Sequence, residues 1–172
     1  VNIHFPKDQE KLTKAQFRLK FEELFFIQLQ LISKNLLNKQ KIKGYRFEKV
    51  GDFFNKMYHN HLPFDLTNAQ KRVLKEIRND MGGHSQMNRL LQGDVGSGKT
   101  VVALMSMLLA LDNDFQACLM APTEILSNQH FIGLSEMAKP LGINIRILTG
   151  STKAKERREI HEQLLSGEIQ IL

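Results

Sequence analysis

The sequence predicts an α/β fold, in which helices flank a parallel sheet, with an α-helical region in front of it. Three observations predict it. Apolar runs of strand length alternate with helical periods after Pro63. A glycine-rich loop joins the first such run to a helix, and a helical period occupies residues 8–38. We therefore expect two parts, a helical, basic linker at 1–60 and an α/β nucleotide-binding part at 61–172.

The helical region is predicted from apolar positions that recur every three or four residues between 8 and 38. Thr13 to Gln16 resembles a capping box, so the segment is either one long helix or two. A basic connector follows at 39–44, and a short amphipathic helix is expected near 50–59. The periodic positions are Leu12, Phe17, Phe21, Leu24, Phe25, Gln28, Leu31, Ile32 and Leu36.

The α/β part begins at a second capping box, Thr67 to Gln70, which predicts a helix that ends near Met81 at Gly82-Gly83. From there strands and helices alternate with short loops, which is typical of a parallel sheet. We expect strands at 88–92, 116–121 and 144–148 and the start of a fourth at 169, with helices at about 98–111, 123–138 and 153–166.

Composition excludes several classes. Apolar residues make up 42% of the 172 residues, which is too many for a disordered chain. The single cysteine, Cys118, excludes an internal disulfide framework and a zinc cage built from cysteines, and it favours a reducing compartment. No apolar run has membrane-spanning length, so we expect no membrane partner. The net charge of +6 comes from residues 1–60, where 12 basic and 6 acidic side chains lie, against 12 of each in the remainder.

The strongest motif is a phosphate loop that matches G-x-x-x-x-G-K-[ST] at every fixed position, between a predicted strand and a predicted helix. Its glycines let backbone N–H groups turn inward around a phosphate, and the helix N-terminus adds partial positive charge. Lys99 is expected to reach the outer phosphates, and Thr100 to hold Mg²⁺. The loop consists of Gly93, Asp94, Val95, Gly96, Ser97, Gly98, Lys99 and Thr100.

A second nucleotide feature precedes the loop. Gln70 carries an amide that can both donate to and accept from an adenine edge, which suits ATP over GTP. The ring of Phe64 could stack on the base. Gln70 also stands where a capping box needs it, so a purely structural role remains open.

Taken together, these residues resemble the RecG family of bacterial superfamily-2 DNA helicases. The resemblance rests on 62–70, on 89–100 and on 120–126 with Gln129-His130, and it extends through 3–6 and 18–24 over nearly the whole chain. It implies an incomplete RecA-like domain behind the linker of a wedge domain. It also implies ATP and Mg²⁺ as cofactors, with Lys99 and Thr100 in the catalytic machinery and Gln70 as the adenine-reading residue of the helicase Q motif.

The resemblance also implies contacts with the DNA backbone from two loops that follow strands. One is Pro122, Thr123 and Glu124, and the other is Thr149, Gly150 and Ser151. Such contacts carry little sequence information, as a translocase requires. The implied partner is branched or duplex DNA, at replication forks and Holliday junctions in recombination and repair, in the bacterial cytoplasm at the nucleoid.

ATP hydrolysis in this family needs an Asp-Glu pair, and no Asp-Glu dipeptide occurs in the chain. The apolar run 108–111 closed by Asp112 imitates such a strand, but it lies within the helix that follows Lys99, so we reject it. We therefore expect a fragment that lacks this motif, the second motor lobe and the wedge domain, and that hydrolyses ATP only at background rate.

Two alternatives remain. One is another superfamily-2 translocase, such as a transcription-repair coupling factor. The other is a nucleotide-binding module without motor activity.

Overall fold

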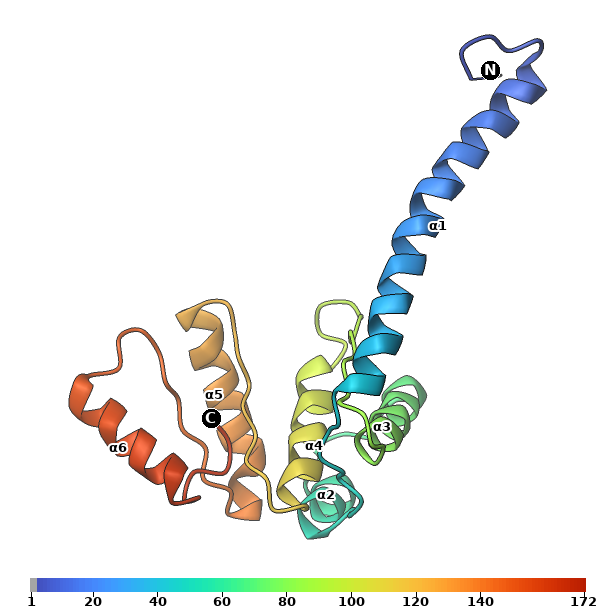
Figure 1. The fold of residues 1–172 in the computed structure, drawn as a ribbon. Coiled ribbons are helices and arrows are strands. Elements are labelled where there is room, and N and C mark those ends of the chain that lie inside the picture. Colours follow the sequence, from blue (N-terminus) through green and yellow to red (C-terminus); the bar gives the residue numbers. More distant parts are fainter. Residues whose placement is uncertain (1–2) are drawn as a thin grey trace. The chain divides into compact units, whose positions relative to one another are not determined.

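The computed structural model describes residues 3–172, except for the side chains of 38–41. The chain divides into two compact units, residues 1–43 and 44–172 (Figure 1). Residues 44–60 thus pack within the second unit. Where the structure describes the chain, no helix has the length and apolar character needed to cross a bilayer.

The first unit contains one uninterrupted helix, α1 (Gln9–Lys41). Asp8 Oδ1 accepts the N–H of Lys11 at 2.7 Å, which supplies an acceptor for the first turn. The capping box predicted at Thr13 is wrong, because Thr13 lies inside the helix and its hydroxyl donates to the carbonyl of Gln9 at 3.0 Å. The predicted basic connector is helical through Lys41.

The second unit is built around α4 (Lys99–Leu111). Leu104, Met105 and Leu108 on this helix are fully buried. α3 (Asn68–Met81) packs against α4, and so does α2 (Asp52–Lys56), which continues into a π-helical turn, Met57–His61 (Figure 1). The predicted short amphipathic helix is therefore present, with Met57 fully buried in the core.

Asp112, the residue after α4, caps α2 across the core. Its carboxylate accepts the backbone N–H groups of Gly51, Phe53 and Phe54 at 2.9, 3.0 and 3.1 Å. The first-turn N–H groups of a helix have no partner within the helix, so this carboxylate satisfies three of them. The rejection of Asp112 as a catalytic acid thus agrees with a structural role for this side chain.

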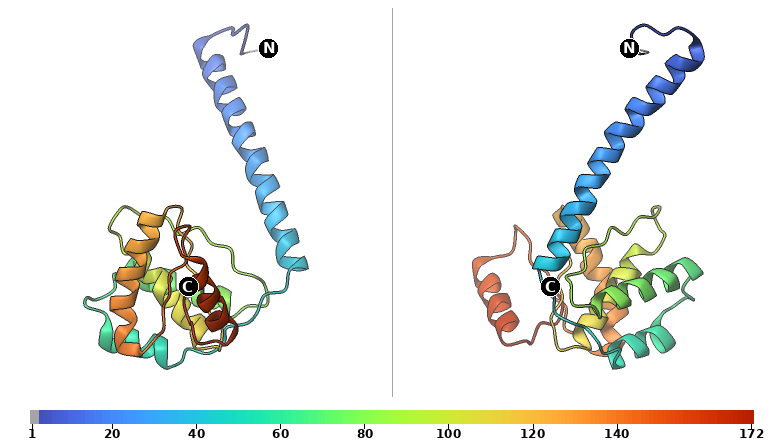
Figure 2. Two further views of the ribbon diagram at one scale, coloured as in Figure 1. Left: turned by 90° about the vertical axis from the view of Figure 1, so that its left-hand side faces the viewer. Right: turned by 45° about the vertical axis from the view of Figure 1, so that its right-hand side comes forward.

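The remaining helices are α5 (Glu124–Ala138), a 3₁₀ turn (Lys139–Leu141) and α6 (Ala154–Leu165), which match the predicted helices within a residue or two at each end (Figure 2). Gly142, at φ +67°, ends the 3₁₀ turn. Leu134 and Ala138 of α5 join the core around α4.

The predicted parallel sheet is reduced to isolated bridges between three extended segments. Ile171 forms single parallel bridges with Ala117 and with Ile145, so the segment from 169 lies between the other two. The bonds include Ala117 N–H to Gln170 O at 2.9 Å and Arg146 N–H to Ile171 O at 3.0 Å. Within the described residues no ladder is long enough to be a strand, and 88–92 pairs with none of these segments; Leu90 there is 89% exposed. A strand needs neighbours along its length, and these segments have too few.

Candidate nucleotide and nucleic-acid sites

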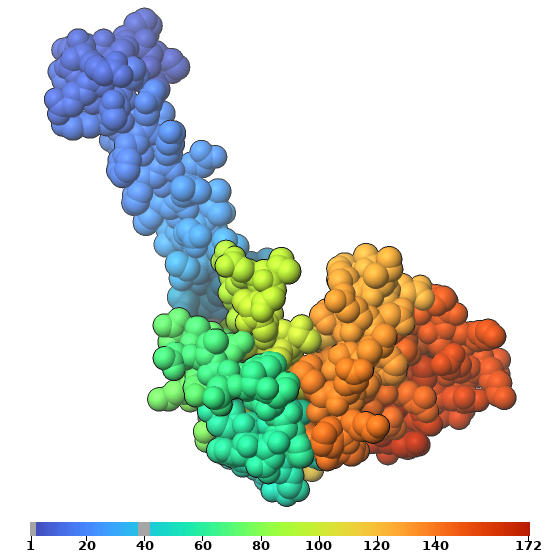
Figure 3. Space-filling model, turned by 180° about the vertical axis from the view of Figure 1, so that it is seen from behind, coloured from blue at the N-terminus to red at the C-terminus, as the bar shows by residue number. Residues whose placement is uncertain are grey.

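The phosphate loop is a tight turn that leads directly into α4. Gly96 and Gly98 have φ of +80° and +79°, a backbone conformation that favours glycine. The N–H of Ser97 bonds to the carbonyl of Asp94 at 3.2 Å, and α4 starts at Lys99. Figure 3 shows this segment, in yellow-green, standing out from the surface of the second unit. Gly98, a fixed glycine of the motif, thus lies where the turn requires a positive φ, and Gly96 supplies a second such position.

Lys99 folds back over the loop that precedes it. Its Nζ donates to the carbonyls of Gly93 and Asp94 at 2.9 and 2.7 Å. This places an ammonium at the loop, where phosphate oxygens could replace the two carbonyls as acceptors. The residues fit a nucleotide phosphate, with Thr100 next on the helix as the hydroxyl that would hold Mg²⁺.

Gln70 connects the first turn of α3 to the phosphate loop. Its Oε1 accepts the N–H of Thr67 at 2.8 Å and its own N–H bonds to Thr67 Oγ1 at 3.2 Å, so the predicted capping box is confirmed. Its Nε2 donates to the carbonyl of Ser97 at 3.0 Å. A Cβ at Gly98 would collide with that same nitrogen. The cap and the proximity to the nucleotide site are therefore properties of one side chain.

Phe64, the predicted stacking ring, is 47% exposed on the segment before α3. A stacking role for it stays a prediction.

Arg89 fixes the segment that enters the loop onto α3. Its Nε contacts Asp80 at 2.5 Å and its Nη1 contacts Glu76 at 2.8 Å. The hydrogen bonds that Arg89 donates to Asp80 and, to a lesser extent, to Glu76 raise the pKa of its guanidinium above the ordinary value. An arginine side chain is charged at neutral pH, so Arg89 forms a charged contact with both carboxylates there.

The two loops that were predicted to contact DNA lie together. Thr123 caps α5 by accepting the N–H of Leu126 at 3.3 Å. The carboxylate of Glu124 accepts the hydroxyls of Thr149, at 3.2 Å, and of Ser151. The loops border a cavity of about 380 Å³. Its lining includes Pro122, Thr123, Glu124, Thr149 and Gly150 from the predicted set.

Arg157, which lines the same cavity from α6, was not among the residues predicted to contact DNA. Its Nη2 donates to the carbonyl of Thr149 at 2.9 Å. Four of the six residues 153–158 are basic and one is acidic, so the start of α6 carries a local excess of positive charge. That cluster was the available signal, but nothing in it distinguishes Arg157 from its neighbours.

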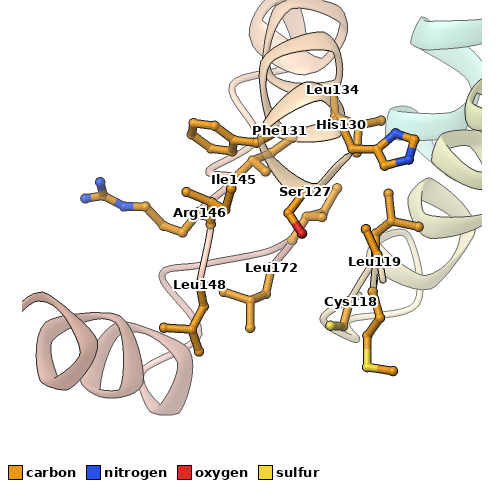
Figure 4. A pocket seen from close by; sticks show the side chains of 14 residues that line it. Cys118, Leu119, Ser127, His130, Phe131, Leu134, Ile145, Arg146, Leu148 and Leu172 are labelled. Atoms are coloured by element: carbon orange, nitrogen blue, oxygen red, sulfur yellow. The ribbon is translucent and has the colours of Figure 1, made fainter. Parts of the chain in front are cut away.

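A second cavity, of about 340 Å³, lies between α5 and the three extended segments (Figure 4). Its lining is mainly apolar, with Ser127, His130 and Arg146 as the polar members that Figure 4 labels. Ser127 and Leu148 also border the cavity between the predicted DNA loops, so the two hollows adjoin. None of the predicted site residues lines this cavity. In the described part of the chain, no cluster of three or more His, Cys, Asp or Glu side chains is placed to hold a metal ion.

Comparison with known proteins places these features in a family. The family model described as DEAD/DEAH box helicase matches residues 67–172. The protein "ATP-dependent DNA helicase RecG" of Synechocystis sp. is 46% identical over the whole chain, which covers 21% of that relative. The Bacillus subtilis protein of the same name is 41% identical over 99% of the chain and is covered to 25%.

A solved structure, "Structure of RecG bound to three-way DNA junction", is similar over 99% of the chain with a TM-score of 0.82 and 43% identity. The chain covers 23% of the chain in that structure. It thus spans about a quarter or less of the relatives named here.

Proposed function

Because the chain belongs to the DEAD/DEAH box helicase family, we propose that the full-length protein is an ATP-dependent DNA helicase of the RecG type. It would act on branched DNA, at replication forks and Holliday junctions, in recombination and repair. In this proposal ATP binding closes a cleft between two motor lobes and drives duplex DNA past a wedge. The cellular site is the bacterial cytoplasm, at the nucleoid.

The observation that carries the proposal is the phosphate loop with its two attached side chains. Lys99 donates to the loop carbonyls and Gln70 donates to Ser97. The glycine turn is therefore flanked by a cation and by an amide that can both donate to and accept from an adenine edge. This arrangement supports ATP as the nucleotide. Thr100, at the start of α4, would hold Mg²⁺, which when bound neutralises charge that develops on the phosphates.

The DNA contacts are proposed for the paired loops at 122–124 and 149–151. Both carry hydroxyls and backbone N–H groups, which bind phosphates without reading bases. The similar solved structure contains a three-way DNA junction by its own description, which supports branched DNA as the partner. The rest of the polypeptide would supply the Asp-Glu pair, the second lobe and the wedge.

The proposal is tested on the full-length protein by its ATPase activity with and without forked DNA. We expect hydrolysis to rise by at least an order of magnitude with DNA and to fall to background in Lys99→Ala, since this lysine stabilises the transferring phosphoryl group. The chain 1–172 alone should hydrolyse ATP only at background rate. Hydrolysis by the full-length protein that ignores DNA would contradict the proposal.

A further inference from the structure

Thr149, in the second predicted DNA loop, is held from two sides by opposite charges. Arg157 Nη2 donates to its carbonyl at 2.9 Å, and Glu124 Oε1 accepts its hydroxyl at 3.2 Å. The same carboxylate oxygen also accepts the hydroxyl of Ser151. Glu124 therefore occupies both hydroxyls that would serve a DNA phosphate.

The cavity beside Thr149 has only two charged lining residues, Arg157 and Glu124. Among the described residues neither forms an ion pair, and Arg157 donates a single hydrogen bond, to the neutral carbonyl of Thr149. A guanidinium has five N–H donors, so most of the donors of Arg157 have no protein acceptor. A half-buried cation whose charge has no counterion is suited to an anionic ligand.

We propose that Arg157 binds a DNA backbone phosphate in this cavity and that Glu124 opposes it. The proposal deepens the DNA-binding role proposed above and rests on it. A guanidinium can present two parallel N–H donors to a phosphate, which the hydroxyl-bearing loops alone cannot do.

Glu124 acts as the competitor of the phosphate. Each hydroxyl has one proton to donate, so Thr149 and Ser151 can donate to a phosphate only when the carboxylate releases them. The carboxylate also repels a phosphate in the same cavity. Binding of DNA is therefore weaker than the cation and hydroxyls alone would allow, which helps a translocase to release each phosphate as it moves.

The test measures the affinity of the full-length protein for a fluorescent forked DNA across a series of salt concentrations. We expect Arg157→Gln to bind about tenfold more weakly, with the slope of log K against log salt reduced by about 0.9, because one phosphate contact is lost. The matched control is Arg158→Gln, since Arg158 is the exposed neighbour of Arg157 on the same helix and does not line the cavity. Its slope should equal that of the wild type.

Two more variants separate phosphate binding from a structural role. Arg157→Lys keeps the charge and a donor, so its salt slope should stay at the wild-type value. Glu124→Gln keeps an acceptor for the hydroxyls and loses the charge, so it should bind DNA about threefold more tightly. If Arg157 and Glu124 had purely structural roles, Arg157→Gln and Glu124→Gln would both bind DNA more weakly, and the salt slope of both would be unchanged.

Any one of three results overturns the inference: a wild-type salt slope in Arg157→Gln, a reduced slope in Arg157→Lys, or weaker DNA binding by Glu124→Gln. As long as the wild type binds forked DNA, these results leave the proposed function intact. A wild-type protein that does not bind forked DNA overturns both.

Discussion

Gln70 donates from Nε2 to the carbonyl oxygen of Ser97 at 3.0 Å, so the first turn of α3 is hydrogen-bonded to the phosphate loop. The same side chain accepts the N–H of Thr67 and thereby caps α3. A change at Gln70 therefore acts on both the helix and the loop, and the two effects can be separated by the substitution chosen.

Gln70→Glu keeps an acceptor for Thr67 but loses the donor to Ser97, whereas Gln70→Ala loses both. We expect the alanine variant to lower the free energy of unfolding by about 1 kcal/mol, because the side-chain bonds to Thr67 and Ser97 are lost, and the glutamate variant to lower it less. Both should weaken ATP binding, as measured by calorimetric titration. An alanine variant that binds ATP as the wild type does would remove Gln70 from the nucleotide site.

Gly96 and Gly98 provide a matched pair within the loop, since both have positive φ. A Cβ at Gly96 would meet open space, whereas one at Gly98 would collide with Gln70. Each alanine substitution carries a backbone cost of about 1 kcal/mol, but only Gly98→Ala also displaces Gln70. We expect Gly98→Ala to bind ATP more weakly than Gly96→Ala by fluorescence titration. Equal losses would mean that the contact between Gln70 and the loop does not contribute to binding.

Asp112 should be a stability residue with no part in nucleotide chemistry. Asp112→Asn removes the charge and one of the two oxygens that accept the N–H groups of Gly51, Phe53 and Phe54. We expect the free energy of unfolding to fall by about 2 kcal/mol in urea denaturation, because charged caps are lost from partly buried groups.

Asp114→Asn is the control for Asp112→Asn, because Asp114 is exposed and its φ of 65° is one that asparagine tolerates. It should unfold as the wild type does. If Asp112→Asn lowered ATP affinity and left stability unchanged, the structural role would be contradicted.

Helices and the phosphate loop could be predicted because their signals are local. Thr67 and Gln70 form the predicted capping box, and Gly98, a fixed glycine of the motif, has the positive φ that the turn requires. The capping box predicted at Thr13 was wrong, because the helix already begins at Gln9. Thr13 lies inside it, and its hydroxyl donates to the carbonyl of Gln9 in the preceding turn. A capping-box pattern inside a longer helical period therefore does not by itself mark the start of a helix.

Contacts between residues far apart in the chain could not be predicted from local sequence patterns. Asp112 looked like the end of a strand, and its partners on α2 lie 58 to 61 residues away. Arg157 reaches Thr149 because α6 folds back beside the loop, which no spacing rule reveals. The predicted strands contain the right apolar runs, yet pairing depends on neighbouring segments. In the part of the chain that the structure describes, Ile171 is the one residue that bridges to a segment on each side.

Residues 93–100 should bind the phosphates of ATP through Lys99. The most direct test is the affinity of the chain for ATP with Mg²⁺, measured by calorimetric titration for the wild type and Lys99→Ala, with circular dichroism to verify that both are folded. We predict that the variant binds at least about tenfold more weakly, because a charge-assisted contact to phosphate is lost. Equal affinities in two folded proteins would contradict the assignment of the phosphate loop.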